Sequence, residues 1–371
     1  MKLCFLADVR SIHTKKWVEY FAKEHEMDLI TLNYPKKERI GLPEEVYEKM
    51  NVRVYKISKK MPFLLFAPFK IRRLIKKIKP DLVHAHYVTQ YGFCGAFSGF
   101  HPFVISAWGS DVLVDPHKSK ILKLMVKFAL KKGDLIICDG DHIKRPLIEL
   151  GAKAQKIRLV YFGTDTKKFK PEERSEKLRE MLSIFNSPAV ISLRGLKPIY
   201  DVGSLIASAS LVLKEIPKAK FIIAGKGSEE NRLKDLAKSL GILDSVKFVG
   251  LIPNNELPQY LSSMDVYVST SLSDAGLAAS TAEAMACGLP VVITDFGDNT
   301  KWVEDGVSGF IVPLKDPESL AEKIIYLLKK EDVRKEFGRR NRKIIEERNN
   351  YYKEMKKMEN IYIELVERYK T

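Results

Sequence analysis

Short runs of Val, Ile and Leu recur along the chain and alternate with stretches of helical spacing. Such runs are typical of strands that are buried on both faces of a sheet, and helices between them favour parallel strands. The sequence therefore predicts an α/β fold with two Rossmann-like domains, each built on a parallel sheet. Six runs precede a charged interval and six follow it, at residues 3–7, 29–32, 52–57, 82–86, 103–108, 135–138, 189–193, 221–224, 246–249, 266–269, 291–294 and 310–312.

The charged interval separates the two series and contains Pro171 and Pro188 without any strand pattern, which marks it as the connection between domains. A chain of 371 residues is long enough for two such domains with separate cores. We expect the domains at residues 1–166 and 167–345. Residues 346–371 have the apolar spacing of an amphipathic helix, which we expect to return to the N-terminal domain.

Charge is distributed unevenly along the chain. The formal net charge is +16, and the whole excess lies within the first 170 residues, most densely between Glu48 and Asp81, where no acidic residue occurs. A positive field of this kind attracts the phosphates of lipids or nucleic acids. No apolar run is long enough to cross a bilayer, so we expect a cytoplasmic protein. The four cysteines are far apart in apolar stretches, so we interpret them as core residues.

One segment, residues 271–292, carries the most chemical information. Small residues lead into a predicted helix that begins near Ser280 and ends at Gly288, so backbone N–H groups between Gly276 and Ser280 can face an anion. Glu283 has two interpretations at this spacing. It is either the second member of a capping box with Ser280 or a ligand contact.

The same segment resembles the donor-sugar signature of the family-4 (GT4) retaining glycosyltransferases of GT-B fold, in which a Glu precedes Ala-Met-Ala-x-Gly-x-Pro-Val-Val; here this is Glu283 to Val292. Residues 224–227, 246–250, 264–269, 304–310 and 316–321 resemble further parts of the family pattern. The resemblance implies two Rossmann-like domains facing a central cleft. It also implies transfer of a hexose from a UDP or GDP sugar to a glycan or lipid-linked acceptor, with retention of configuration.

By this resemblance the C-terminal domain binds the nucleotide sugar, with Glu283 on the ribose hydroxyls. The family's other Glu, which holds the transferred sugar, is replaced by Ala275, and the adjacent Asp274 is a candidate substitute. The identity of the sugar therefore does not follow from the sequence. The predicted donor-binding residues are Arg194, Lys197, Asp274, Gly276, Leu277, Ala278, Ala279, Ser280 and Glu283.

Arg194 and Lys197 follow a predicted strand, and both can bind a diphosphate through charge-assisted hydrogen bonds. Their loop resembles the family's Gly-Arg-Leu loop, although Tyr200 occupies the position of its later Lys. Without the resemblance, two solvated surface cations would be the ordinary interpretation.

In the first half, polar residues again follow strands, where open α/β sheets bind ligands. The predicted acceptor or cleft residues are Ser11, His13, His86, Trp108 and Asp111, and the predicted catalytic residues are Asp111, His86 and Arg194. Loop caps and core histidines are the structural alternatives for these residues.

The sequence predicts no metal and no cofactor. Asp139 and Asp141 match the Asp-x-Asp of a different glycosyltransferase class, but we interpret them as a helix cap, and His84 and His86 lack a third ligand. Gly225-Lys226-Gly227 lacks the remainder of a dinucleotide fingerprint. In the family, the leaving phosphate is thought to help accept the proton of the acceptor, so no enzymic nucleophile is required.

Two further functions are alternatives: a nucleotide-sugar epimerase of the same fold, and a non-enzymatic phosphate or nucleic-acid binder that uses the basic half. We expect no nucleic-acid partner, because the aromatic residues there are flanked by apolar residues. An anionic membrane surface is a candidate partner of residues 61–79, where Phe-rich sequence precedes a basic helix. The apolar face of that helix, with Ile71, Leu74, Ile75 and Ile78, can contact either lipid or the protein core.

Overall fold

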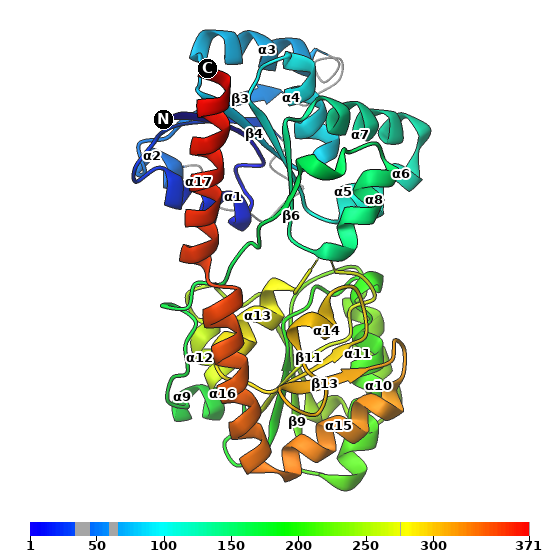
Figure 1. The fold of residues 1–371 in the computed structure, drawn as a ribbon. Coiled ribbons are helices and arrows are strands. Elements are labelled where there is room, and N and C mark those ends of the chain that lie inside the picture. Colours follow the sequence, from blue (N-terminus) through cyan, green and yellow to red (C-terminus); the bar gives the residue numbers. More distant parts are fainter. Residues whose placement is uncertain (34–44, 59–65, 275, 371) are drawn as a thin grey trace. The chain divides into compact units, whose positions relative to one another are not determined.

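The computed structural model of the chain describes residues 1–33, 45–58, 66–274 and 276–370. The chain divides into two compact units. Unit 1 comprises Met1–Phe162 and Tyr352–Thr371, and unit 2 comprises Gly163–Tyr351. Each unit is an α/β structure with its own parallel sheet (Figure 1), which confirms the predicted fold class.

The sheet of unit 1 has the strand order β3-β2-β1-β4-β5-β6-β7, and all its neighbours are parallel. Buried Val, Ile and Leu fill the strands, as the sequence pattern predicts, but the short edge strand β7 has too few apolar residues to be recognised. The strands are β1 (Lys2–Leu6), β2 (Glu26–Asn33), β3 (Arg53–Ser58), β4 (Leu82–His86), β5 (Phe103–Ala107), β6 (Leu135–Cys138) and β7 (Ile157–Leu159).

Helices cover both faces of this sheet. Rings of α1 and α17 pack against Phe5 and His84 on one face, whereas α4 packs against Leu6 and Phe103 and α7 against Ile105 on the other. The helices of unit 1 are α1 (Ile12–Phe21), α2 (Glu45–Glu48), α3 (Ala67–Ile78), α4 (Phe93–Ser98), α5 (Ser110–Leu113), α6 (Asp115–Lys118), α7 (Lys120–Lys132), α8 (Lys144–Glu149) and α17 (Tyr351–Lys370), with a π-helical turn at Val88–Gly92.

Long-range contacts attach the C-terminal helix α17 to unit 1. The Tyr362 hydroxyl lies 2.5 Å from His84 Nδ1, and His25 Nε2 lies 2.9 Å from Glu359 Oε1. The backbone N–H of Tyr161 donates to Glu354 Oε2 at 2.8 Å. Because Tyr362 is fully buried, the last helix is part of the core of this unit.

Unit 2 has the strand order β10-β9-β8-β11-β12-β13, again with parallel neighbours throughout. Its core forms where the apolar faces of α10 and α15 cover the sheet. The strands are β8 (Ala189–Ser192), β9 (Lys220–Ala224), β10 (Val246–Gly250), β11 (Val266–Ser269), β12 (Val291–Thr294) and β13 (Gly309–Val312). The helices are α9 (Glu176–Met181), α10 (Val202–Glu215), α11 (Glu230–Ser239), α12 (Leu257–Ser262), α13 (Ala279–Ala286), α14 (Asn299–Trp302), α15 (Pro317–Lys329) and α16 (Glu331–Arg348).

The charged interval that the sequence marks as a connection is folded onto unit 2. It contains α9, and the buried guanidinium of Arg179 donates to the carbonyls of Ser263, Ile184 and Ser187. The cation is tolerated inside because these carbonyls replace its water. Charge in this interval therefore does not indicate a solvated linker.

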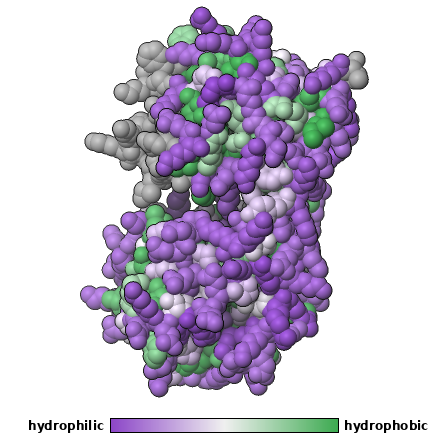
Figure 2. Space-filling model, turned by 90° about the vertical axis from the view of Figure 1, so that its left-hand side faces the viewer, coloured by the Kyte–Doolittle hydropathy of each residue, from purple (hydrophilic) through white to green (hydrophobic). Residues whose placement is uncertain are grey.

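Hydrophilic side chains predominate on the face drawn in Figure 2, where apolar side chains form small scattered groups. Within the described ranges, no helix combines the length and the apolar composition that a membrane span requires.

Candidate active site

Each sheet has a point where the strand order reverses, and open α/β sheets bind ligands at the carboxyl ends of the strands there. In unit 2 the reversal falls between β8 and β11, and in unit 1 between β1 and β4. Arg194 follows β8 and Asp274 follows β11, whereas Ser11 follows β1 and His86 ends β4. The topology therefore brings the predicted residues of each unit to its own reversal point.

Arg194 is the centre of a hydrogen-bonded cluster in unit 2. Its Nη2 donates to Asp274 Oδ1 at 2.5 Å and to Ser271 Oγ at 3.0 Å, while Nη1 lies 3.3 Å from Ser280 Oγ. The guanidinium carbon lies 4.5 Å from the centre of the Tyr200 ring. Because only 8% of Arg194 is exposed, these contacts hold the guanidinium in one orientation.

Electrostatics keep this cation charged. Burial lowers the pKa of Arg194, but the carboxylate of Asp274 and the nearby Tyr267 and Tyr200 outweigh that effect and raise it. Burial raises the pKa of Tyr267, whose hydroxyl donates to Ser280 Oγ at 2.8 Å. Sequence reasoning missed Tyr267 and Ser271, because both occur in or beside a run that reads as a core strand.

Two glycines allow the loop after β9 to approach the loop that carries Arg194. A Cβ atom on Gly225 would lie 2.3 Å from the carbonyl oxygen of Arg194, and one on Gly227 would lie 1.9 Å from that of Leu196. A hydrogen bond of 3.1 Å from the N–H of Leu196 to the carbonyl of Lys226 joins the two loops. This Gly-Lys-Gly sequence therefore serves backbone packing, because a side chain at either glycine would separate the loops.

Helix α13 begins beside this cluster. Its N-cap is Ala278, which provides no side-chain cap. Ser280 lies inside the first turn, and its hydroxyl oxygen accepts hydrogen bonds from Tyr267 and Arg194. The capping-box interpretation of Ser280 and Glu283 is therefore wrong. The N–H groups of the first turn have no acceptor within the helix, so they remain oriented for an anion.

The other predicted donor residues lie around the same helix. Glu283 is on α13 and is 7% exposed, and Gly276 is buried just before the helix. Leu277, Ala278 and Ala279 lead from there into the first turn, and the side chain of Lys197 is exposed on the loop after β8. Ala275 lies outside the described residues. Direct binding of a donor by these residues stays a prediction.

Asp111 is buried at the start of α5 in unit 1. Its Oδ2 accepts the N–H of Val88 at 2.6 Å and its Oδ1 accepts the N–H of Trp108 at 2.9 Å. Burial raises the pKa of this carboxyl to about 7, although the backbone hydrogen bonds act in the opposite direction. Asp111 therefore joins the loops after β4 and β5, and its predicted catalytic role stays a prediction.

His86 lies in an aromatic cage. Its ring centre is 5.1 Å from those of Phe5 and Trp17 and 5.4 Å from that of Trp108. Burial, followed by the neighbouring His13, lowers the pKa of His86 to about 3. The imidazole is therefore neutral at physiological pH, so any part it takes in proton transfer begins from the neutral form.

The predicted residue His13 extends this cage. Its ring centre lies 5.4 Å from that of Trp108 and 5.1 Å from that of Phe162. Burial, followed by Lys16, lowers the pKa of His13 to about 4. Ser11 is the N-cap of α1, and its side chain makes no capping hydrogen bond.

Several buried polar atoms around the cage have no hydrogen-bond partner in the structure. They include both ring nitrogens of His86, Thr14 Oγ1, Trp17 Nε1 and Trp108 Nε1. Such atoms are costly to leave unpaired, so these groups can form hydrogen bonds with a hydroxyl group that enters the cage. Sequence reasoning missed Thr14 and Trp17, because helical spacing alone assigns both to the core.

Metal ligands are the remaining question. In the part of the chain that the structure describes, no three His, Cys, Asp or Glu side chains are arranged to hold a metal ion. Asp141 forms an ion pair of 2.5 Å with Lys144, and the short helix at Asp141–Ile143 has Gly140 as its N-cap without a side-chain cap. The predicted helix-cap role of Asp139 and Asp141 is therefore wrong.

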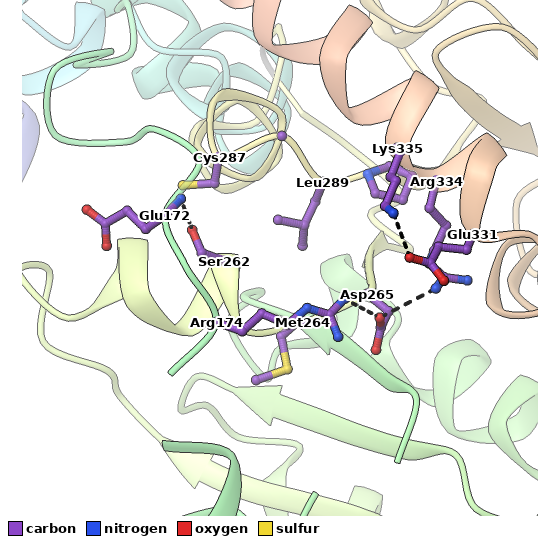
Figure 3. A pocket seen from close by; sticks show the side chains of 12 residues that line it. Glu172, Arg174, Ser262, Met264, Asp265, Cys287, Leu289, Glu331, Arg334 and Lys335 are labelled. Carbon is purple, nitrogen blue, oxygen red and sulfur yellow. Dashed lines mark hydrogen bonds and ion pairs between the residues drawn. The ribbon is translucent and has the colours of Figure 1, made fainter. Parts of the chain in front are cut away.

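A cavity of about 160 Å³ lies elsewhere in unit 2, at the opposite end of the strands (Figure 3). Arg174 lies 2.6 Å from Asp265, and Lys335 lies 2.8 Å from Glu331, so charged groups in its lining neutralise one another. None of the predicted site residues lines this cavity.

Comparison with known proteins identifies the class. The family model described as glycosyl transferases group 1 matches residues 173–344, and the model described as glycosyl transferase 4-like matches residues 2–140. Together with the two parallel sheets, these matches define a glycosyltransferase. The chain belongs to the family-4 glycosyltransferases of GT-B fold, as its sequence motifs predict.

Individual relatives are distant. The chain is 23% identical to the N-acetyl-alpha-D-glucosaminyl L-malate synthase of Bacillus anthracis, over 92% of this chain and 90% of that protein. It is 28% identical to the alpha-monoglucosyldiacylglycerol synthase of Streptococcus pneumoniae, over 63% of this chain and 58% of that protein. The structure of Anabaena HepE in complex with UDP-glucose is similar in fold, with a TM-score of 0.84, 21% identity, and coverage of 98% of this chain and all of that one.

Proposed function

We propose that the protein transfers a hexose from a nucleoside diphosphate sugar of the UDP or GDP type to an acceptor, with retention of configuration. The observation that carries the proposal is the buried Arg194, which is held by Asp274, Ser271 and Ser280 beside the first turn of α13. A fixed cation and oriented N–H groups stabilise the charge that develops on a leaving diphosphate. The UDP-glucose bound to Anabaena HepE supports this class of donor.

We further propose that transfer requires neither a metal nor a cofactor, with Arg194 and α13 in the place that a divalent cation takes in other enzymes. In this proposal Glu283 binds the ribose hydroxyls of the donor. The cage around His86 receives the acceptor, whose hydroxyls would pair with the buried polar atoms there.

The proposed acceptor is a glycan or a lipid-linked molecule. A lipid-linked acceptor is supported by the similarity to the alpha-monoglucosyldiacylglycerol synthase of Streptococcus pneumoniae. The basic first half of the chain would favour an acceptor that is held at an anionic lipid surface.

A donor screen tests the proposal. The protein is incubated with UDP, GDP and ADP sugars, and slow hydrolysis to the free sugar is followed with and without a chelator. We expect release from one class of donor and no effect of chelation, and the anomer first released should keep the configuration of the donor. Loss of activity with chelator and recovery with manganese would contradict the metal-free proposal. Conversion of one nucleotide sugar into another would indicate the epimerase.

A further inference from the structure

Three helices on one face of the sheet in unit 1 share an unusual composition. Helices α3, α4 and α7 contain ten Lys and Arg residues and no acidic residue. Helix α4 packs against both α3 and α7, so the three form one continuous layer (Figure 1). The basic field that the sequence shows in α3 therefore extends to α7, which is more than 40 residues further along the chain.

The apolar face of α3 is not the exposed part of this layer. Ile71, Ile75 and Ile78 are buried in the protein, so the interpretation that they contact lipid is wrong. The exposed apolar side chains of this helix are at its N-terminal end, where Phe69 is 59% exposed. Phe63 and Leu64, in the Phe-rich sequence that precedes this helix, lie outside the described residues.

A strip of apolar side chains crosses the three helices. The ring centre of Phe69 lies 4.8 Å from that of Phe97, which lies 6.4 Å from that of Phe93. Phe93 in turn lies 5.7 Å from Phe128 of α7. The strip thus continues from α3 through α4 onto α7.

On α7 the strip continues to Leu124 and Ile121, which are 66% and 71% exposed. With Phe128 they follow the spacing of one helix face. A row of exposed lysines, Lys120, Lys123, Lys127 and Lys131, runs beside them at the same spacing. Single exposed apolar side chains are ordinary, but a contiguous exposed apolar strip marks an interaction surface.

We propose that this layer, the α3–α4–α7 face, docks onto an anionic lipid bilayer. Ten cations without an acid match a negatively charged surface, and Leu124 and Ile121 are placed to enter the boundary between headgroups and acyl chains. A nucleic acid fits less well. Phosphate contacts would leave the exposed aliphatic side chains of Ile121 and Leu124 in water.

Vesicle flotation without donor or acceptor tests this inference, so the result does not depend on glycosyl transfer. We expect binding to vesicles of phosphatidylcholine with phosphatidylglycerol, weak binding to phosphatidylcholine alone, and loss of binding with added salt. Changing Lys123, Lys127 and Lys131 to Ser should weaken binding about fivefold per lysine. Changing Ile121 and Leu124 to Ser should weaken it about tenfold or more at every salt concentration.

Matched variants in unit 2 serve as controls. One control changes three exposed cations of α16 to Ser and so removes the same charge: Arg339, Arg340 and Lys343. The other control changes two exposed leucines to Ser: Leu240 and Leu243. Both controls should bind vesicles as the unchanged protein does. All variants should keep their melting temperature and their affinity for UDP.

Three outcomes would overturn the inference: no binding to anionic vesicles at low salt, equal effects of the control variants, or binding to duplex DNA or RNA in place of vesicles. Vesicle binding by a protein that binds no nucleotide would contradict the proposed function and leave the docking face supported.

Discussion

The ends of the two sheets where the strand order reverses differ in how their polar groups are satisfied. In unit 2 the two terminal nitrogens of Arg194 already bind Asp274, Ser271 and Ser280, although its Nε has no hydrogen-bond partner. In unit 1 the imidazole of His86 has no hydrogen-bond partner for either nitrogen. A cation that stabilises a leaving diphosphate must be oriented before the donor binds. Neutral polar groups can instead form their hydrogen bonds when a hydroxyl group of the acceptor binds. The difference is what we expect if unit 2 binds the donor and unit 1 the acceptor, as proposed above.

Removing Arg194 should have the largest effect on this contrast. We expect Arg194→Ala to lower donor turnover about a hundredfold, because one preorganised charge contact is lost. The measurement is the rate of sugar release at saturating donor, together with the affinity for the nucleotide diphosphate.

The matched control is Arg179→Ala, another buried arginine of unit 2 that binds carbonyls away from Arg194. It should lower the melting temperature and leave nucleotide affinity unchanged. Equal losses of affinity in both variants would mean that Arg194 acts through stability alone.

His86 tests the other side of the comparison through pH. Its pKa is lowered from 6.5 to about 3 in the folded protein, so the unfolded chain binds one more proton between these values. Stability therefore falls as the pH falls through this window, by about 1.4 kcal/mol per pH unit for one histidine. Asp111 acts in the opposite sense, because its raised pKa makes stability fall as the pH rises towards about 7.

We expect His86→Phe to reduce the pH dependence of the free energy of unfolding by about 1.4 kcal/mol per pH unit, the contribution of one histidine. Urea unfolding at several pH values near 5 measures the slope, and a series near pH 8 separates the packing change from protonation. An unchanged slope would show that His86 is not held neutral by burial.

Glu283 should have a moderate effect that is confined to binding. Because α13 is not capped by Glu283, we expect Glu283→Gln to leave the melting temperature almost unchanged. Nucleotide affinity should fall about tenfold, as for the loss of one charged hydrogen bond. Isothermal titration with UDP and GDP measures it, with the exposed Glu304→Gln as the control. Unchanged affinity and turnover would remove Glu283 from the donor site.

Asp274 should have the smallest effect, and its sign is informative. If Asp274 only holds Arg194, then Asp274→Asn spares the diphosphate from displacing a carboxylate, and UDP affinity should rise about threefold. The same titration measures it, and melting temperature is the control for folding. A loss of affinity would instead show that Asp274 contacts the donor itself, as the sequence predicts.

Much of the fold follows from local pattern. Strands such as Leu82–His86 and Val266–Ser269 have the predicted bounds, because a buried parallel strand requires a continuous apolar run. The edge strand Ile157–Leu159 is not predicted from the sequence, because its three residues include only one buried side chain and form no apolar run. The helix at Glu176–Met181 is not predicted either, because its charged residues suggest a solvated connection between domains.

The candidate site divides in the same way. The resemblance to the family motifs predicts Arg194 and Glu283 as donor-binding residues, whereas spacing alone leaves Glu283 open between a helix cap and a ligand contact. The partners of Arg194 lie 77 to 86 residues away, so their hydrogen bonds have no local signature. Folding also directs both oxygens of Asp111 to backbone N–H groups, which no spacing rule anticipates.

The basic layer of unit 1 shows the same boundary between local and tertiary information. Periodicity marks α3 as an amphipathic helix with cations on one side, and this is a property of neighbouring residues alone. Whether Ile71 and Ile75 face lipid or protein depends on what the helix packs against, and folding buries them. The strip from Phe69 to Ile121 exists only because α4 lies between α3 and α7, which brings together side chains that sequence separates by about 50 residues.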